Sequence, residues 1–138
     1  MRYVLMFLCA ALLFGCNSID GIFGSSEEAE LYTDRPQYAG NEAITLTLAN
    51  RTEAKTLGYN LCSSALEELR VGKWQRTALQ DDWVCTAALY LLEANKQASF
   101  VFDFDQPIPS GVYRFKTIIF LQDKDKRVEL ITNEFQVR

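Results

Sequence analysis

The sequence predicts an all-β protein, folded as an antiparallel β-sandwich of about eight short strands. Apolar and polar residues alternate with a period of two along several stretches, which is typical of strands that bury one face. Turn signals recur about every ten residues between these stretches. The chain has 138 residues, which is enough for one domain after a signal peptide and a short linker.

Three stretches carry the strand prediction. In "AITLTLAN" the apolar residues from Ile44 to Leu48 share one face and the threonines share the other. "SFVFDF" alternates in the same way from Phe100 to Phe104. "VYRFKTIIFL" alternates at first and is then apolar on both faces over 118–121, which predicts a central strand covered on both sides.

The C-terminal stretch predicts a hairpin followed by a change of register. Residues 123–126, "DKDK", supply a charged hairpin loop. After that loop, Val128 and Leu130 share one parity, whereas Phe135 and Val137 share the other. Something near 132–133 must therefore shift the register, and a β-bulge is the usual device.

Two stretches fit more than one structure. In "SSALEELR" the pair Ser64 and Glu67 matches a capping box, so Ser64–Arg70 is either a helical turn after Cys62 or a strand. "WVCTAALYLLEANK", residues 83–96, contains good helix formers but also alternates. We interpret it as a strand because strands are predicted on both sides of it, and a helix is the alternative.

The order of these stretches resembles the bacterial immunoglobulin-like domains of exported proteins. The resemblance runs from Leu31 to Arg138 and includes "YAGNEAITLTLANRT", "GYNLC", "IPSGVYRFKTIIFL" and "TNEFQV". It implies an immunoglobulin-like antiparallel β-sandwich. Tyr113 follows a turn, where a tyrosine can bury its ring and return its hydroxyl to the upstream backbone as a tyrosine corner. An ordinary half-buried aromatic residue is the alternative.

The N-terminus has the pattern of a secretory signal. A basic start is followed by an uncharged run from Val4 to Phe14, which is shorter than the about 20 residues of a membrane-spanning helix. "LFGC", ending at Cys16, resembles the lipobox of bacterial lipoproteins, although Phe14 departs from the smaller residue usual there. We therefore predict a lipoprotein signal peptide over residues 1–15. An ordinary cleaved signal with an incidental cysteine is the alternative.

The lipobox resemblance implies a membrane anchor. In that family the cysteine thiol receives a diacylglyceryl group and the new amino terminus is acylated, with fatty chains such as palmitate, so Cys16 is the predicted lipidation site. Asn17 in the next position favours the periplasmic face of the outer membrane by the family's sorting rule. Residues 16–30, "CNSIDGIFGSSEEAE", are rich in Gly, Ser and acid and predict a flexible acidic linker. The sandwich domain is then expected over 31–138.

The remaining cysteines predict a disulfide. Cys9 lies in the signal and Cys16 is the lipidation candidate, which leaves Cys62 and Cys85 in the exported domain. An oxidising compartment favours a bridge between them. A metal site is an alternative, but structural zinc takes four ligands. A redox-active pair is another alternative, but the two residues lack the Cys-x-x-Cys spacing.

The composition offers little support for catalysis or nucleic-acid binding. The chain has 18 acidic and 14 basic residues and no histidine. Phosphate binding needs a clustered basic surface, so we expect no nucleic-acid partner. Without histidine the commonest general base is missing. Asp103 and Asp105 share a strand face, but two carboxylates are too few for calcium. We predict that the protein is not an enzyme and holds no cofactor or metal.

Trp74 and Trp83 are the candidate partner surface, because aromatic anchors dominate interface energetics. We expect one of them to be buried and the other partly exposed. The predicted function is that of a membrane-anchored lipoprotein whose non-catalytic module binds another cell-envelope protein. A protease inhibitor is the alternative, because "TLTLANRT", "LEANKQASFVFDF" and "SGVYRF" look like the layout of the intracellular proteinase inhibitor family. Leu79–Val84 would then be the inserting loop.

Overall fold

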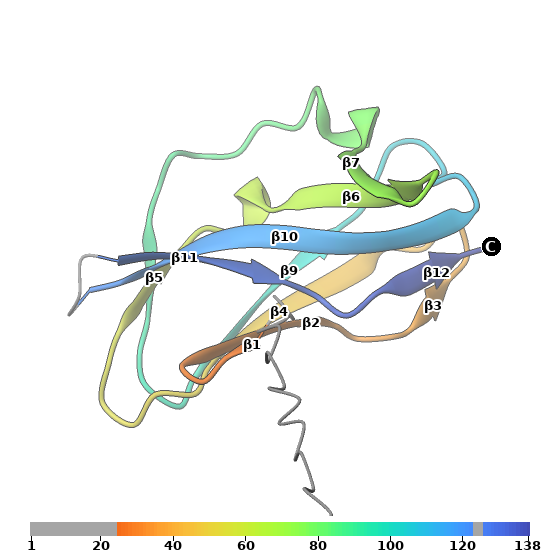
Figure 1. Ribbon diagram of the computed structural model, residues 1–138. Helices are drawn as coiled ribbons and strands as arrows, with labels where there is room; N and C mark the ends of the chain where they lie inside the picture. The colour runs from red at the N-terminus through yellow and green to blue at the C-terminus, as the bar shows by residue number, and fades with distance from the viewer. Residues whose placement is uncertain (1–24, 123–125) are drawn as a thin grey trace, which may run out of the picture.

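The computed structural model describes residues 25–122 and 126–138. The predicted signal peptide, the lipidation candidate Cys16 and residues 16–24 of the predicted linker lie outside these ranges, as does the tip of the predicted hairpin loop. Within them the chain forms two β-sheets packed face to face (Figure 1), with two short 3-10 turns. The predicted all-β, immunoglobulin-like sandwich is confirmed.

The first sheet contains four antiparallel strands in the order β1-β2-β4-β9. Their bounds are Ser25–Ser26 for β1, Ala29–Thr33 for β2, Ile44–Asn50 for β4 and Gln97–Phe102 for β9. The strands predicted from "AITLTLAN" and "SFVFDF" are therefore β4 and β9, which are direct neighbours although about fifty residues apart in sequence.

The second sheet is built around β10, the 11-residue strand Gly111–Leu121. It pairs on one side with β11 and β12, and on the other with β5 and β6. β3 pairs with β12, β7 with β6, and β8 with β5. The bounds are Gln37–Tyr38 (β3), Leu57–Tyr59 (β5), Ala65–Arg70 (β6), Lys73–Arg76 (β7), Tyr90–Leu92 (β8), Lys126–Ile131 (β11) and Phe135–Val137 (β12). Among the described pairs, β3 with β12 is the parallel one.

The core lies between β4 and β9 of one sheet and β10 of the other. Ile44, Leu46 and Leu48 are fully buried on the inner face of β4. Phe102 from β9 stacks on Phe115 from β10, with ring centroids 4.6 Å apart. The period-two pattern therefore identified the buried face of both β4 and β9, because alternate side chains of a strand point to opposite faces.

The register changes between β11 and β12, although both pair with β10. From Lys116 to Tyr113, three residues along β10, the partner chain advances four residues, from 131 to 135. Thr132 lies at this extra residue and binds to Phe115 of β10 through two hydrogen bonds. Its backbone N–H donates to the carbonyl of Phe115 at 2.9 Å, and its hydroxyl oxygen accepts from the Phe115 N–H at 2.9 Å. The β-bulge predicted near 132–133 is confirmed.

The first ambiguous stretch forms a strand. β6 begins at Ala65, directly after a 3-10 turn, η1, that spans Leu61–Ser63. The buried side chain of Gln80 stabilises this arrangement, because its amide nitrogen donates to the Ser64 carbonyl at 2.9 Å and its oxygen accepts from the Leu66 N–H at 2.6 Å. The helical-turn alternative for Ser64–Arg70 is therefore wrong.

The strand prediction for residues 83–96 is wrong over most of its length. Only β8 is regular, and Figure 1 shows the preceding segment as a long trace without an arrow between β7 and β5. The Asn60 side chain donates to the carbonyl oxygens of Thr86 and Ala88 at 2.8 and 3.0 Å. These bonds take the place of strand pairing, because backbone carbonyls accept equally well from a side-chain amide.

The predicted boundary between linker and domain also needs correction. The composition of residues 25–30 predicts a flexible linker, but β1 begins at Ser25 and Ala29 is fully buried in β2. β2 pairs with β4 from Ala29 onward, and this pairing orders a segment whose composition is that of a linker. Among the described residues no helix has the length and apolarity needed to cross a membrane.

Candidate functional site

Asp103 and Asp105, the acidic pair that shares a predicted strand face, do not form a metal site. Asp103 and Asp105 are both exposed. Within residues 25–122 and 126–138 no three His, Cys, Asp or Glu side chains lie together in a way that would hold a metal ion. The predicted site residues lie elsewhere in the fold, and two of them, Cys62 and Trp83, line a groove.

Cys62 and Cys85 form the predicted disulfide, with Cα atoms 5.7 Å apart. Cys62 lies in η1 and Cys85 in the irregular segment before β8. The bridge therefore ties that segment to the edge of the sandwich. By the chain-entropy estimate, closing a loop of 23 residues stabilises the fold by about 3 kcal/mol.

Trp83 packs over this disulfide and over aromatic residues within and just after β9. Its indole Nε1–H donates to the Cys62 sulfur at 3.2 Å. Its ring lies 5.5 Å from the ring of Phe102 and 5.6 Å from that of Phe104. The side chain is half-buried, so it covers the core at the open side of the sandwich and also forms part of the surface.

Trp74 lies on the outer face of the second sheet, away from Trp83. The Arg114 guanidinium stacks over its ring at 4.2 Å, and Arg114 Nε donates to the Glu67 carboxylate at 2.8 Å. Trp74 is also half-buried. The expectation of one buried and one partly exposed tryptophan is therefore wrong, because both are half-buried, and the fold does not bring the two residues into one surface.

A row of apolar side chains crosses the other end of this outer face, and the sequence reasoning missed it. Gly58 pairs with Phe120 on one side and Leu91 on the other, so these three positions share a face. Leu89 lies over the glycine, where an added Cβ would come within 3.0 Å of its Cδ2. Ile118 is two residues from Phe120 on the same strand. We call Leu89, Leu91, Ile118 and Phe120 the apolar row.

The apolar row is open to solvent. Leu89 is 51%, Leu91 58% and Ile118 40% exposed. The run "IIFL" in β10 correctly predicted a central strand, but its expected cover on both faces is incomplete. On the outer face Ile118 is 40% exposed, whereas Phe120 is half-buried and has the Arg127 guanidinium 5.6 Å from its ring centroid. The sequence did contain a signal for this surface. Both the two-sided apolar strand and the "LYLL" run, residues 89–92, place apolar side chains on this face.

β8 is the edge strand beside this row, and its other face borders a groove. Tyr90 is 50% exposed and lies against Tyr59, with ring centroids 5.9 Å apart. Both tyrosines line a groove of 470 Å³ that also includes Trp83 and Phe100. β8 therefore presents aromatic surface on its inner side and aliphatic surface on its outer side.

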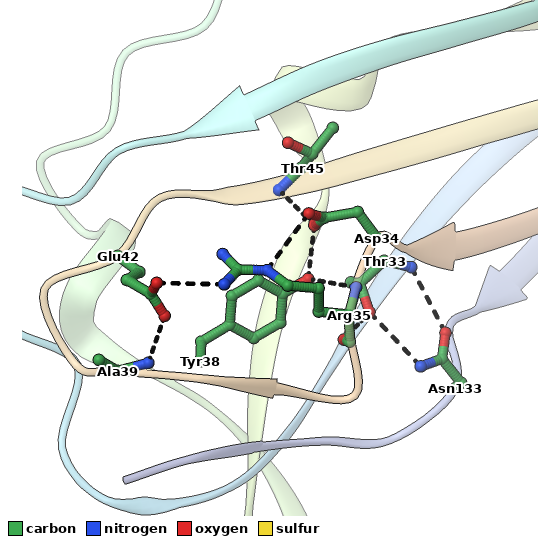
Figure 2. Close-up of polar contacts among 8 residues, drawn as sticks. All are labelled: Thr33, Asp34, Arg35, Tyr38, Ala39, Glu42, Thr45 and Asn133. Carbon is green, nitrogen blue, oxygen red and sulfur yellow. Dashed lines mark hydrogen bonds and ion pairs between the residues drawn. The ribbon is translucent and has the colours of Figure 1, made fainter.

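A polar network links residues of the segment that connects β2 to β4, and Figure 2 shows its members. The Tyr38 hydroxyl donates to the Asp34 carboxylate at 2.6 Å and accepts from the Arg35 backbone N–H at 3.0 Å. Arg35 stacks on the Tyr38 ring at 4.6 Å and pairs with Glu42 at 3.1 Å. Thr45 donates its backbone N–H to Asp34 at 3.2 Å.

The pKa values of Tyr38 and Asp34 indicate that this network has a structural role. Burial, together with the hydrogen bond to Asp34, raises the pKa of Tyr38 to about 12. Burial alone would raise the pKa of Asp34, but the hydrogen bonds from Tyr38 and Thr45 outweigh it and hold the pKa below its usual value. Tyr38 thus stays a neutral donor and Asp34 a charged acceptor. No motif in the sequence pointed to this network.

The predicted inhibitory segment Leu79–Val84 is held against the fold at its start and is exposed towards its end. Ala78–Gln80 forms a 3-10 turn, η2, and Gln80 is buried with both ends of its amide hydrogen-bonded to the residues around β6. Val84 is the member that stands clear, at 93% exposure, directly before the disulfide at Cys85.

Comparison with known proteins adds little beyond these observations. No family model matches the chain, and no curated protein sequence matches it. One similar solved structure is PapD-like domain 7 of human CEP192, an ASH/PapD-like domain, at 14% identity over 82% of this chain and 87% of that chain, with a TM-score of 0.40. Another is the structural-genomics target SoR45, at 13% identity over 79% and 81%, with a TM-score of 0.41. The assignment of the fold comes from the sheet topology described above.

Proposed function

We propose that this chain is a lipid-anchored, non-catalytic interaction module of the bacterial cell envelope that binds another envelope protein at the β8 edge. The observation that carries the proposal is that this edge exposes apolar or aromatic side chains on both of its faces. Leu89 and Leu91 are half-exposed on its outer side and Tyr90 on its inner side. An extended partner segment that adds to β8 would place alternate side chains on the apolar row and in the groove.

The chemistry of β8 differs from that of a protected edge. Soluble proteins guard edge strands with charged residues, proline or a covering element. β8 has the sequence Tyr90–Leu92, and it pairs only with β5 among the described strands. Contiguous exposed apolar surface of this kind marks protein-binding sites.

The lipobox-like "LFGC" supports placement of this module at a membrane. Two or more acyl chains anchor a protein stably, whereas a single chain binds only marginally. The intact mass of the protein from its native host tests this part. We expect a chain that begins at Cys16, carries three acyl chains and gains two protons on reduction of the disulfide. A mass without lipid would contradict the anchor.

Photo-cross-linking in the native host tests the edge. A photoreactive amino acid in place of Leu91 should give a specific adduct with an envelope protein. The matched control is the same substitution at Val71, a fully exposed apolar residue in the turn between β6 and β7. The same adduct from both positions, or an adduct from neither, would show that β8 is not the binding edge.

Protease inhibition is the second candidate, and one observation favours it. Val84 is 93% exposed and the next residue is held by the disulfide, which is the arrangement of a constrained contact loop. A host protease should then lose activity at stoichiometric protein, and Val84→Asp should restore it. Full protease activity in the presence of the native chain would exclude this function.

A further inference from the structure

We infer that a cleft beside Trp83 binds an arginine side chain of a protein partner. The cleft has a volume of 350 Å³ and lies on the side of Trp83 that faces the end of β9. The rings of Trp83 and Phe104, with centroids 5.6 Å apart, contact each other and form one aromatic wall, and the fully buried Tyr113 also lines the cleft. Asp82 and Asp105 stand in its lining and are exposed to solvent.

The charges of the cleft are unbalanced. Four charged side chains line it: Glu68, Arg70, Asp82 and Asp105. Arg70 is already engaged, because its Nε donates to the Glu68 carboxylate at 2.6 Å. Asp82 and Asp105 form no ion pair with any residue in the part of the chain that the structure describes. The cleft therefore keeps two uncompensated negative charges next to aromatic surface.

A buried hydroxyl gives independent support for a ligand. Thr77 also lines the cleft and is only 5% exposed. Its Oγ1 has no hydrogen-bond partner among the described residues. Buried polar side chains are almost always hydrogen-bonded, and an unpaired one needs an explanation. The oxygen itself is buried, so the Thr77 side chain must turn towards the cleft for a ligand N–H group to supply the missing partner.

These features fit a guanidinium group. Arginine stacks its planar group on aromatic faces and directs five N–H donors to carboxylates and hydroxyls. The cleft offers two carboxylates, one aromatic wall made of two rings, and the buried hydroxyl of Thr77 behind its lining. We assign the guanidinium to a protein partner because Trp83 lines both this cleft and the groove beside β8. A partner bound at the β8 edge would therefore have to pass only the Trp83 side chain to reach the cleft. This choice of a protein as the source rests on the proposed function.

The test uses the full chain with its lipid, held in detergent and labelled with 5-fluorotryptophan. The two tryptophans give two fluorine resonances, and Trp74→Phe assigns them. N-acetyl-arginine amide is the probe, and N-acetyl-citrulline amide is its uncharged analogue. We expect a saturable shift of the Trp83 resonance with arginine and about tenfold weaker binding of citrulline. The double variant Asp82→Asn, Asp105→Asn should weaken arginine binding by about tenfold or more.

The matched control is Asp81→Asn, which removes an exposed charge next to Asp82 from a residue outside the cleft. It should bind arginine as the native chain does. Equal shifts with citrulline, equal losses in both sets of variants, or no shift at all would overturn the inference. Tighter binding of spermidine than of the arginine probe would identify a site for small amines and would also overturn it. Failure here with intact cross-linking at Leu91 would leave the proposed function in place.

Discussion

The hydroxyl of Tyr113 donates a 2.7 Å hydrogen bond to the backbone carbonyl of Pro109, four residues upstream. The ring is fully buried between the sheets, in stacked contact with Phe135 at 6.1 Å. This is the tyrosine corner predicted from the position of Tyr113 after a turn. It ties the connection between β9 and β10 to the core, and the same residue forms the base of the Trp83 cleft.

Loss of this hydroxyl should destabilise the domain. Tyr113→Phe keeps the ring but leaves the Pro109 carbonyl without its donor, so we expect a loss of about 1 kcal/mol in the free energy of unfolding. Urea denaturation followed by fluorescence measures it. Tyr90→Phe is the control, because that side chain is half-exposed, and it should change stability by less than about 0.5 kcal/mol. Equal effects would contradict a corner.

Removal of the disulfide should cost more than the loss of the corner. The double variant Cys62→Ser, Cys85→Ser frees the segment before β8, and we expect a loss of about 3 kcal/mol. Denaturation of the native chain with and without a reducing agent gives the same comparison without mutation. An unchanged denaturation midpoint in both experiments would show that the bridge does not constrain the unfolded chain.

Stability should fall at high pH through Tyr38. Its pKa is raised from 10.0 to about 12 by burial and by the hydrogen bond to Asp34, so the folded state favours the neutral phenol. This contribution is complete below pH 10 and is lost as the pH rises from 10 towards 12. Denaturation across this range should show a steeper decline for the native chain than for Tyr38→Phe. Parallel declines would mean that other groups control the alkaline limb.

Gly40 and Gly58 should respond differently to the same substitution. A Cβ on Gly40 would lie 2.7 Å from the Ile108 carbonyl oxygen, which belongs to backbone and cannot move aside. A Cβ on Gly58 would meet only the flexible end of Leu89. We expect Gly40→Ala to destabilise the domain by about 1–3 kcal/mol, as overpacking does, and Gly58→Ala by less than about 1 kcal/mol. Thermal unfolding of the two variants compares them, and a larger loss for Gly58→Ala would contradict the geometry.

Several parts of the fold were predictable because they depend on local pattern. The parity of Ile44 to Leu48 identified an inner face, and the change of parity after Leu130 identified the bulge. Both follow from the two-residue repeat of a strand, which does not depend on what lies next to it. The two cysteines outside the N-terminal region likewise limited the disulfide to one pairing.

The failures share a cause in long-range contacts. Residues 83–96 alternate like a strand, but the disulfide and the Asn60 side chain hold residues 83–89 in an irregular path. Residues 25–30 have the composition of a linker, but pairing of β2 with β4 makes residues 29–30 strand, and β1 then pairs with β2. The partners in these contacts lie far away in sequence, so no local pattern records them.

The candidate site, like the fold, has one part that the sequence predicted and another that only long-range contacts decided. By itself the sequence determined a β-sandwich with one disulfide. It also predicted an export signal and named two tryptophans as candidate anchors. Only the tertiary structure decided that the tryptophans lie on different faces, that Leu89, Leu91, Ile118 and Phe120 form one open row, and that Asp82 and Asp105 border one cleft. The physical reason is that strand pairing sets neighbours across the sheet, and pairing partners are chosen by the packing of the whole core.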